Sequence, residues 1–262
     1  MNPSRASAIT RPGGLSQTGR LFGVGVGPGD PDLMTRRSIR VIEQARVVAH
    51  FAARGRPGNS LRTVEPMLRP DQIVERLEYP VTTESVSPDD YRDALGTFYA
   101  ESAVRIADHL DAGRDVAIVS EGDPMFYGSY MHLHVRLAHH YETEVVPGVT
   151  AFSAACAAAG TPVVSSDEQF TVLPGILPPD ELTDALRNGD AAVIMKVGRN
   201  LPAVTEALRA ARRDEDAVYV ERASLPAECV LPIADADGRD APYFSIVLVP
   251  GRRMAATPAV PV

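Results

Sequence analysis

Lysine, cysteine and long apolar runs are scarce in this chain of 262 residues, and each scarcity excludes a class of protein. Cys156 and Cys229 are the only cysteines and form no CxxC pattern, which argues against a disulfide framework or a cysteine-rich metal site and favours a reducing compartment. No segment approaches the roughly 20 apolar residues that a transmembrane helix needs. Residues 1–19 lack the apolar stretch of a signal peptide, so we expect a loose tail there and a cytoplasmic protein.

Basic residues are fewer than acidic ones, and almost all of the lysines and arginines are arginine. The chain has 34 acidic and 26 basic residues, a formal net charge of -8, and Lys196 is its single lysine. This acidic balance argues against nucleic acid or an anionic membrane as the main partner. Because the planar guanidinium group pairs well with carboxylates, an arginine-lined site for a polyanionic small molecule remains open.

Familiar catalytic signatures are also missing. The sequence has no GxSxG elbow, which removes support for a serine hydrolase, and no GxxxxGK[ST] phosphate loop. His132 and His134 lie in a stretch with a helical pattern, where two imidazoles at this spacing point to different faces. Without a HExxH pattern or nearby cysteines, we expect no metal site.

Residues 20–150 alternate short β-branched runs with helical patterns. Strands are predicted at 21–26, 46–50, 78–81, 115–120 and 144–146, and helices at 33–44, 90–111 and 129–139. Such alternation is typical of a mostly parallel sheet with helices on both faces.

Residues 151–253 follow another pattern. Strands are predicted at 170–173, 192–197, 217–221, 229–232 and 243–249, and helices at 153–160, 180–187 and 201–212. Because little helix separates the last three strands, some of them must pair antiparallel. The sequence therefore predicts two α/β domains with a cleft between them. The N-terminal domain, 20–150, has a mostly parallel five-stranded sheet, and the C-terminal domain, 151–253, has a mixed five-stranded sheet. Residues 254–262 are predicted to form a second tail.

Three loops rich in glycine or proline follow predicted strands of the first domain. The first reads GVGVGPGDPD over residues 23–32, and its glycines let the backbone approach a ligand closely. It fails the dinucleotide fingerprint, because the third glycine position holds Pro28 or Asp30, depending on the starting glycine. An acidic loop suits a ligand without phosphates better than a pyrophosphate. A plain strand-to-helix turn is the alternative for this loop alone.

The other two loops are SEGDPMFYGS at 120–129 and VVPGVTAF at 145–152. In the former, carboxylates can accept hydrogen bonds from ribose hydroxyls or an ammonium group, while Met125 and Phe126 can flank a flat ring. In the latter, small residues permit close approach of a ligand or of the other domain. Taken singly, the loop at 120–129 could be a capped turn with core aromatics, and the loop at 145–152 could be a site of tight helix packing. Together the three predict a ligand site at the carboxyl edge of the sheet.

The ordered segments GVGVGPGDPDLMT, VSEGDPMFYGS, VVPGVTAFSA and GTPV resemble the tetrapyrrole (corrin/porphyrin) methylase family over about residues 20–253. The segments VVAHFAARGRPGNS, LEYPVTTES and SDEQFTVLPG resemble the precorrin-2 C20-methyltransferase branch, which forms precorrin-3A in cobalamin biosynthesis. The resemblance implies a homodimer of two α/β domains with S-adenosylmethionine as methyl donor in the cleft between them.

The resemblance also implies contacts with the donor, position by position. They fall on Pro28, Glu121, Gly122, Asp123, Phe126, Thr150, Ala151, Met195 and Ala223. Glu121 stands where the family often has glycine, and Ala223-Ser224 stands where Gly-Thr is frequent, which suggests differences between substrate branches.

The implied reaction is attack of an electron-rich ring carbon on an activated methyl group, followed by loss of a proton. Alignment of the two reactants is worth roughly 7–11 kcal/mol at best, which fits a sequence without a catalytic triad. The candidates for the general base are Tyr127, Glu121, Asp123 and His50. The candidates for binding the carboxylate arms of the substrate are Arg54, Arg56 and Arg62, in a predicted loop after the second strand, where exposed solubilising arginines are the alternative.

Other functions remain as alternatives. A methylase of the same family would act on cobalt-precorrin-2, on uroporphyrinogen III, or on a protein as diphthine synthase does. A nucleotide-cofactor oxidoreductase is disfavoured by the missing third glycine. A non-catalytic tetrapyrrole carrier would bind the substrate without transferring a methyl group.

Overall fold

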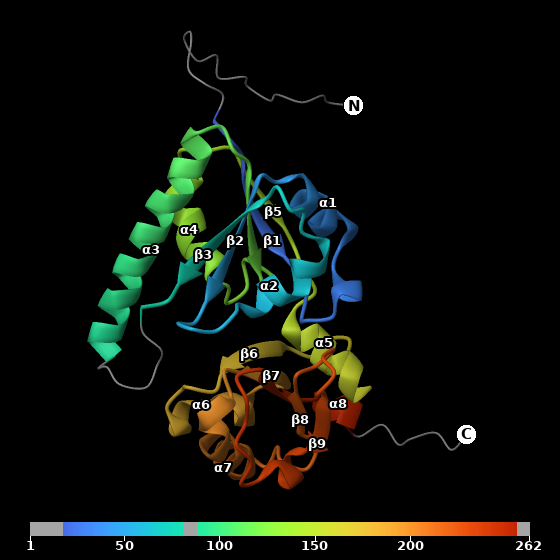
Figure 1. Ribbon diagram of the computed structural model, residues 1–262. Helices are drawn as coiled ribbons and strands as arrows, with labels where there is room; N and C mark the ends of the chain where they lie inside the picture. Colours follow the sequence, from blue (N-terminus) through green and yellow to red (C-terminus); the bar gives the residue numbers. More distant parts are fainter. Residues whose placement is uncertain (1–17, 81–87, 256–262) are drawn as a thin grey trace, which may run out of the picture.

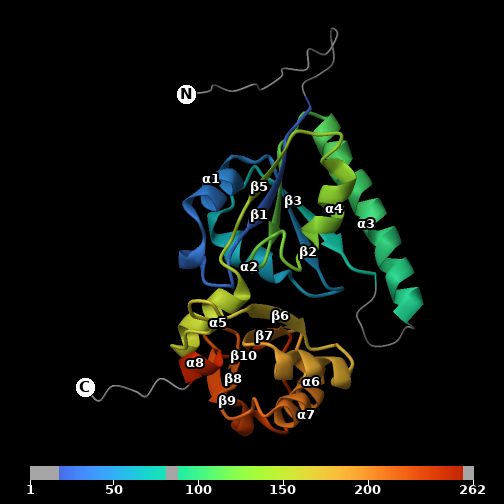
Figure 2. The same ribbon diagram turned by 180° about the vertical axis from the view of Figure 1, so that it is seen from behind.

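Two five-stranded sheets organise the protein, one in each half of the chain (Figure 1). The computed structural model describes residues 18–80 and 88–255. Seen from both sides, the first sheet lies above the second, and the chain passes between them just before α5 (Ala151–Ala159) (Figure 2). The predicted pair of α/β units, one parallel and one mixed, is confirmed. The exact division at residues 150 and 151 stays a prediction.

The first sheet has the strand order β3-β2-β4-β1-β5, and all its pairings are parallel. Its strands are β1 (Leu21–Gly25), β2 (Val47–Ala52), β3 (Ile73–Glu78), β4 (Val116–Ser120) and β5 (Thr143–Val146). Strand β1 lies between β4 and β5, so the carboxyl ends of these three strands share one edge. The three loops singled out in the sequence leave from this edge.

Side chains alternate along these strands and build one apolar core on each face of the sheet. On β4, Val116 and Ile118 belong to one core, and Ala117 and Val119 belong to the other. A strand that is buried on both faces is apolar throughout, which makes it visible in the sequence. The covering helices are α3 (Pro88–Asp111) and α4 (Tyr130–Leu137) on one face, and α1 (Arg36–Gln44) and α2 (Asn59–Val64) on the other.

The second sheet has the order β6-β7-β10-β8-β9, and only β6 and β7 pair in parallel. Its strands are β6 (Phe170–Pro174), β7 (Ala191–Met195), β8 (Val218–Glu221), β9 (Cys229–Pro232) and β10 (Ser245–Val249). Helices α6 (Pro179–Asn188) and α7 (Leu201–Ala211) cover one face, and α5 and α8 (Arg252–Ala255) lie on the other. The short 3-10 helices of the chain are Pro31–Leu33, Glu65–Met67, Gly198–Asn200 and Ile233–Ala236. Within the described ranges no helix has the length and apolarity to cross a membrane.

Three elements differ from the sequence prediction. The third strand is Ile73–Glu78 rather than 78–81, because it is an edge strand with only one fully buried side chain and carries little apolar signal; Val81 lies outside the described residues. The arginine-containing loop after β2 includes helix α2. Of the predicted tails, residues 1–17 and 256–262 lie outside the described residues, whereas Gly19 is buried and α8 extends to Ala255.

The three loops interlock through glycine backbone. A Cβ on Gly25 would lie 2.6 Å from the amide nitrogen of Gly148 and 2.7 Å from the carbonyl oxygen of Gly122. A Cβ on Gly148 would collide with the same Gly122 oxygen. Backbones this close leave no room for side chains, so glycine at these positions is what allows the loops after β1, β4 and β5 to meet.

We expect Gly148→Ala to lower the free energy of unfolding by about 1–3 kcal/mol, because the new methyl group collides with backbone that cannot move aside. Gly96→Ala is the matched control. A Cβ at this exposed position in α3 would meet no atom outside its own helix within 4 Å, so the change should stabilise by about 0.5–1 kcal/mol. Urea unfolding measures both variants, and an undiminished stability of Gly148→Ala would contradict the interlock.

Candidate functional site

Hydrogen bonds lock the three loops to one another. Gly27 and Gly122 exchange backbone hydrogen bonds of 2.8 and 3.3 Å, which join the first loop to the second. The Asp123 carboxylate joins the second loop to the third: its Oδ2 accepts the N–H of Gly148 at 3.0 Å, and its Oδ1 accepts the N–H of Met125 at 2.8 Å. Asp123, a predicted donor contact and base candidate, therefore has both carboxylate oxygens engaged with backbone.

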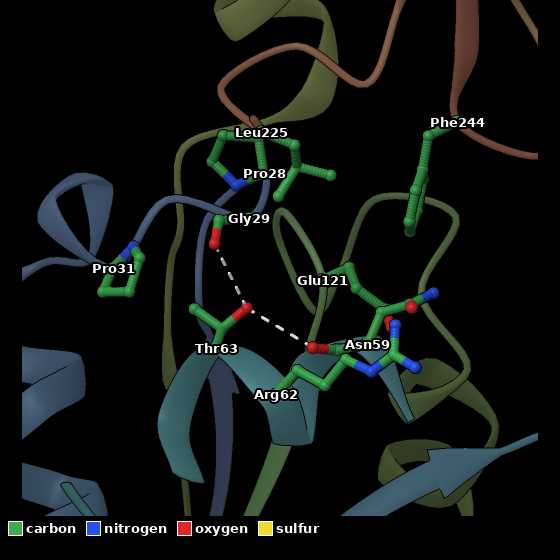
Figure 3. A pocket seen from close by; sticks show the side chains of 9 residues that line it. All are labelled: Pro28, Gly29, Pro31, Asn59, Arg62, Thr63, Glu121, Leu225 and Phe244. Atoms are coloured by element: carbon green, nitrogen blue, oxygen red, sulfur yellow. Dashed lines mark hydrogen bonds between the residues drawn. The ribbon is translucent and has the colours of Figure 1, made fainter. Parts of the chain in front are cut away.

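A pocket of about 200 Å³ lies beside this junction, and both halves of the chain contribute to its walls. It is smaller than the roughly 300–1,000 Å³ of a typical ligand pocket, so it can hold only part of a large ligand. Figure 3 shows Arg62 and Asn59 on the side of α2, with Leu225 and Phe244 of the second half opposite. The lining residues are Pro28, Gly29, Pro31, Asn59, Arg62, Thr63, Glu121, Leu225 and Phe244.

Glu121 presents a carboxylate to this pocket from the end of β4. Its Oε1 accepts the backbone N–H of Ser60 at 3.0 Å. The side chain is accessible from the pocket but is surrounded by protein walls, and this enclosure raises the pKa of the carboxyl group, partly offset by the Ser60 hydrogen bond. A carboxylate in this setting can accept a hydrogen bond or a proton from a bound ligand.

Arg62 is set apart from the other two arginines that were predicted to bind the substrate. It lies in helix α2, where the sequence predicted a loop, and lines the pocket. Arg54 and Arg56 are exposed and do not line it. No salt bridge engages any of these three guanidinium groups in the part of the chain that the structure describes. The structure thus gathers one of the three at the pocket.

Three predicted donor contacts of the second half belong to one apolar cluster. Ala151, Met195 and Ala223 border the same apolar cluster as Phe152, between α5 and the second sheet. The ring of Phe126, from the second loop, meets the Phe152 ring edge-on at a centroid distance of 5.8 Å. Of the nine predicted positions, Pro28 and Glu121 line the pocket, whereas Gly122, Asp123 and Thr150 lie at the loop junction, where Thr150 caps α5.

These surfaces fit a phosphate-free nucleoside better than a nucleotide. The apolar residues around Phe152 offer contact to a flat ring. The adjacent second loop carries the carboxylates of Glu121 and Asp123, which would repel phosphate groups and tolerate a cationic sulfonium. Residues 18–80 and 88–255 contain no group of three or more His, Cys, Asp or Glu side chains arranged to hold a metal ion.

The remaining base candidates occupy different settings. His50 is 1% exposed in β2, with Nδ1 3.4 Å from the carbonyl oxygen of Phe51, and burial lowers the pKa of its imidazole. Tyr127 is 45% exposed, and the Lys196 ammonium of the second half lies 4.7 Å from the centre of its ring. Both members of this cation–π pair have positive φ, 55° and 58°, and such strained residues cluster at functional sites.

Sequence reasoning missed the pocket residues that come from the second half. Phe244 precedes β10, so a rule that looks after the carboxyl ends of strands overlooks it. Because β10 runs antiparallel to β7 and β8, its amino end lies at the edge where those strands end. Tyr243, next to Phe244, is 85% exposed. The antiparallel pairing was the available signal, because it was predicted for these strands.

The loops of two α/β sheets meet at one candidate ligand site, to which both halves of the chain contribute. The chain belongs to the tetrapyrrole (corrin/porphyrin) methylase family, whose model matches residues 20–236.

Two relatives share about half of their aligned residues with this chain. The chain is 51% identical over 243 residues to the cobalamin biosynthesis protein CobIJ of Mycobacterium bovis, a match that covers 92% of this chain and 48% of that protein. The chain therefore spans about half the length of that relative. It is also 51% identical over 235 residues to the precorrin-2 C(20)-methyltransferase of a Sinorhizobium species, covering 89% of this chain and 96% of that protein.

Solved structures share the fold. A cobalt precorrin-4 methyltransferase is 25% identical, with a TM-score of 0.68 and coverage of 88% of this chain and 94% of that one. A uroporphyrin-III C-methyltransferase from Thermus thermophilus, solved with S-adenosylhomocysteine, is 25% identical, with a TM-score of 0.61 and coverage of 88% and 92%.

We expect stability to fall as the pH drops below about 6.5, the ordinary pKa of histidine. Because burial lowers the pKa of His50 in the folded state, the unfolded chain binds a proton first. The contribution of neutral His50 to stability is therefore complete above about pH 6.5 and is lost as the pH falls toward the lowered pKa of the folded state. Urea unfolding at pH 7.5 and 5.5 should show a smaller loss for His50→Gln than for the natural chain. The exposed His139→Gln variant should behave like the natural chain, and an equal loss in all three would refute the assignment.

Proposed function

We propose that this methylase transfers a methyl group from S-adenosylmethionine to C20 of precorrin-2, giving precorrin-3A in cobalamin biosynthesis. The observation that carries the proposal is the juxtaposition of a cationic pocket residue, Arg62, with the interlocked loops that would hold the donor. The match to nearly the full length of the Sinorhizobium enzyme supports the choice of substrate.

Donor binding rests on residues from both halves. S-adenosylmethionine, the methyl donor of this family, supplies a methyl group activated on a sulfonium, so the protein need not form a covalent intermediate. Phe126, Met195 and Ala223 would contact the flat part of the donor, and the backbone around Gly122 and Thr150 would hold its polar part. Positioning of this kind is worth roughly 7–11 kcal/mol at best.

The acceptor carbon must lose a proton after methylation, and Glu121 is the base candidate that best meets this need. Its carboxylate faces the pocket, and its raised pKa brings it closer to neutrality, where general bases are most effective. His50 is buried within the first sheet, and Asp123 has both oxygens bound by backbone N–H groups. Arg62 would pair with one carboxylate arm of the macrocycle and thereby fix its orientation.

We also propose a homodimer that works in the cytoplasm. The family resemblance supports the dimer, and two free cysteines support a reducing compartment. Light scattering should give twice the chain mass of 28.1 kDa, and a mass equal to one chain would overturn the dimer.

The function is tested by incubating the protein with methyl-labelled donor and, in separate reactions, precorrin-2, cobalt-precorrin-2 or uroporphyrinogen III. We expect one label at C20 of precorrin-2, located on the isolated product by carbon NMR. Label on another carbon, or faster transfer to either alternative acceptor, would replace the proposed substrate. Binding of precorrin-2 without transfer would identify a carrier, and calorimetric binding of NAD(P) would indicate an oxidoreductase.

We expect Asp123→Ala to weaken S-adenosylhomocysteine binding by about tenfold or more, because two backbone N–H groups lose a charged acceptor and the loop junction loosens. Asp123→Asn, which keeps one acceptor oxygen, should lose less. Calorimetry measures both affinities, and unchanged binding in Asp123→Ala would remove the second loop from the donor site.

We expect Arg62→Gln to raise the KM for the tetrapyrrole by about tenfold, because a charge-assisted hydrogen bond to one carboxylate arm is lost. Donor affinity should be unchanged. Arg54→Gln and Arg56→Gln are matched controls from the same segment that lie outside the pocket. Equal effects of all three substitutions would show that only overall charge matters.

A further inference from the structure

A buried carboxylate lies behind the second-half wall of the pocket. Glu221 is the last residue of β8 and is 4% exposed. Its Oε1 accepts hydrogen bonds from the Tyr219 hydroxyl at 2.8 Å and from Nε of Arg239 at 3.3 Å, and its Oε2 accepts one from Nη1 of Arg222 at 3.2 Å. A buried charge is costly unless it is fully paired, so these groups hold one another in a single arrangement.

The two arginine partners come from different loops. Arg222 begins the turn after β8, whereas Arg239 lies in the loop that leads into β10. The backbone joins the loops as well, because the N–H of Arg222 donates to the carbonyl oxygen of Phe244 at 2.8 Å. Glu221 therefore ties both loops together from inside the second half.

These loops form the wall of the pocket that faces α2 (Figure 3). Leu225 comes from the first of them and packs against Gly29, where a Cβ would lie 2.5 Å from the leucine side chain. Phe244 comes from the second. Arg222 and Ser224 have φ values of 49° and 69°, a conformation that non-glycine residues keep only when their surroundings enforce it.

We propose that Glu221 is a positioning residue: its pairing with Arg222 and Arg239 sets the places of Leu225 and Phe244, and thereby the orientation of the tetrapyrrole in the pocket. The effect on catalysis rests on the proposed function. The loop clamp, by which we mean the pairing of Glu221 with Arg222 and Arg239, does not depend on it. Glu221 is buried behind the wall, so it acts through the loops rather than by touching the substrate.

The test compares Glu221→Gln, which keeps the shape and removes the charge, with Arg239→Gln, which removes one partner at a half-exposed position. Asp237→Asn is the matched control, because it breaks an exposed ion pair with Arg209 beside the same loop without touching Glu221. For each variant we would measure the thermal unfolding midpoint, kcat and KM for precorrin-2, and amide hydrogen exchange of residues 222–228 and 239–244.

We expect Glu221→Gln to raise the KM on the order of tenfold while kcat stays within about twofold, since displaced walls weaken binding of the macrocycle equally in the ground state and the transition state. Arg239→Gln should also raise the KM, but by a smaller factor. At temperatures well below the unfolding midpoint of each variant, hydrogen exchange should become faster in both loops. Kinetics and exchange equal to those of Asp237→Asn would overturn the proposal, as would a loss of activity that only tracks the unfolded fraction. Should the natural chain transfer no methyl group, the proposed function fails, and exchange alone decides the clamp: unaltered exchange overturns it.

Discussion

Contact between the backbones of Gly25, Gly122 and Gly148 is the constraint on which the site depends. It exists because β1 lies between β4 and β5, so three loops leave the sheet side by side. Loops that pack through backbone hold their exposed amides and carbonyls rigidly, which suits a site that works by alignment rather than by covalent chemistry. The Asp123 carboxylate completes the lock by bridging the second and third loops.

The acidic groups of the protein divide between position and chemistry. Glu221 is buried, and both of its oxygens are paired with arginines that balance its charge. It contributes to the site by holding two loops in place. Glu121 keeps one oxygen bound to backbone and turns toward the pocket without an ion pair among the described residues. A polyanionic substrate would be repelled by an unpaired carboxylate unless that group met a proton donor. Glu121 and Arg62 both line the pocket, so under the proposed function the substrate would place a carboxylate arm at the arginine and a ring edge at the glutamate.

Much of the fold could be predicted because strands buried on both faces are nearly continuous apolar runs: β4 of the parallel sheet and β10 of the mixed sheet are buried along their whole length. The predicted position of strand β3 is wrong because apolar and charged residues mix along this edge strand, and only Leu77 is fully buried. The sequence predicts a loop where helix α2 lies, because Gly58 and Pro57 precede its six residues. At the site, the loops were found through their glycines and strand ends. The burial of His50 and the separation of Arg62 from Arg54 and Arg56 depend on three-dimensional packing, which a local pattern does not contain.

The reversal of direction in the second sheet gives the pocket its second wall. Had β10 run parallel to β7, its amino end would lie at the opposite edge, far from the loops of the first sheet. Running antiparallel, it brings Phe244 beside the turn after β8, where the backbone of Arg222 bonds to it. In a purely parallel sheet, the edge where ligands bind carries only the carboxyl ends of strands. The mixed sheet offers an amino end as well, so the wall that faces Arg62 is built from two loops of opposite direction, and a buried group between them is needed to keep them in register.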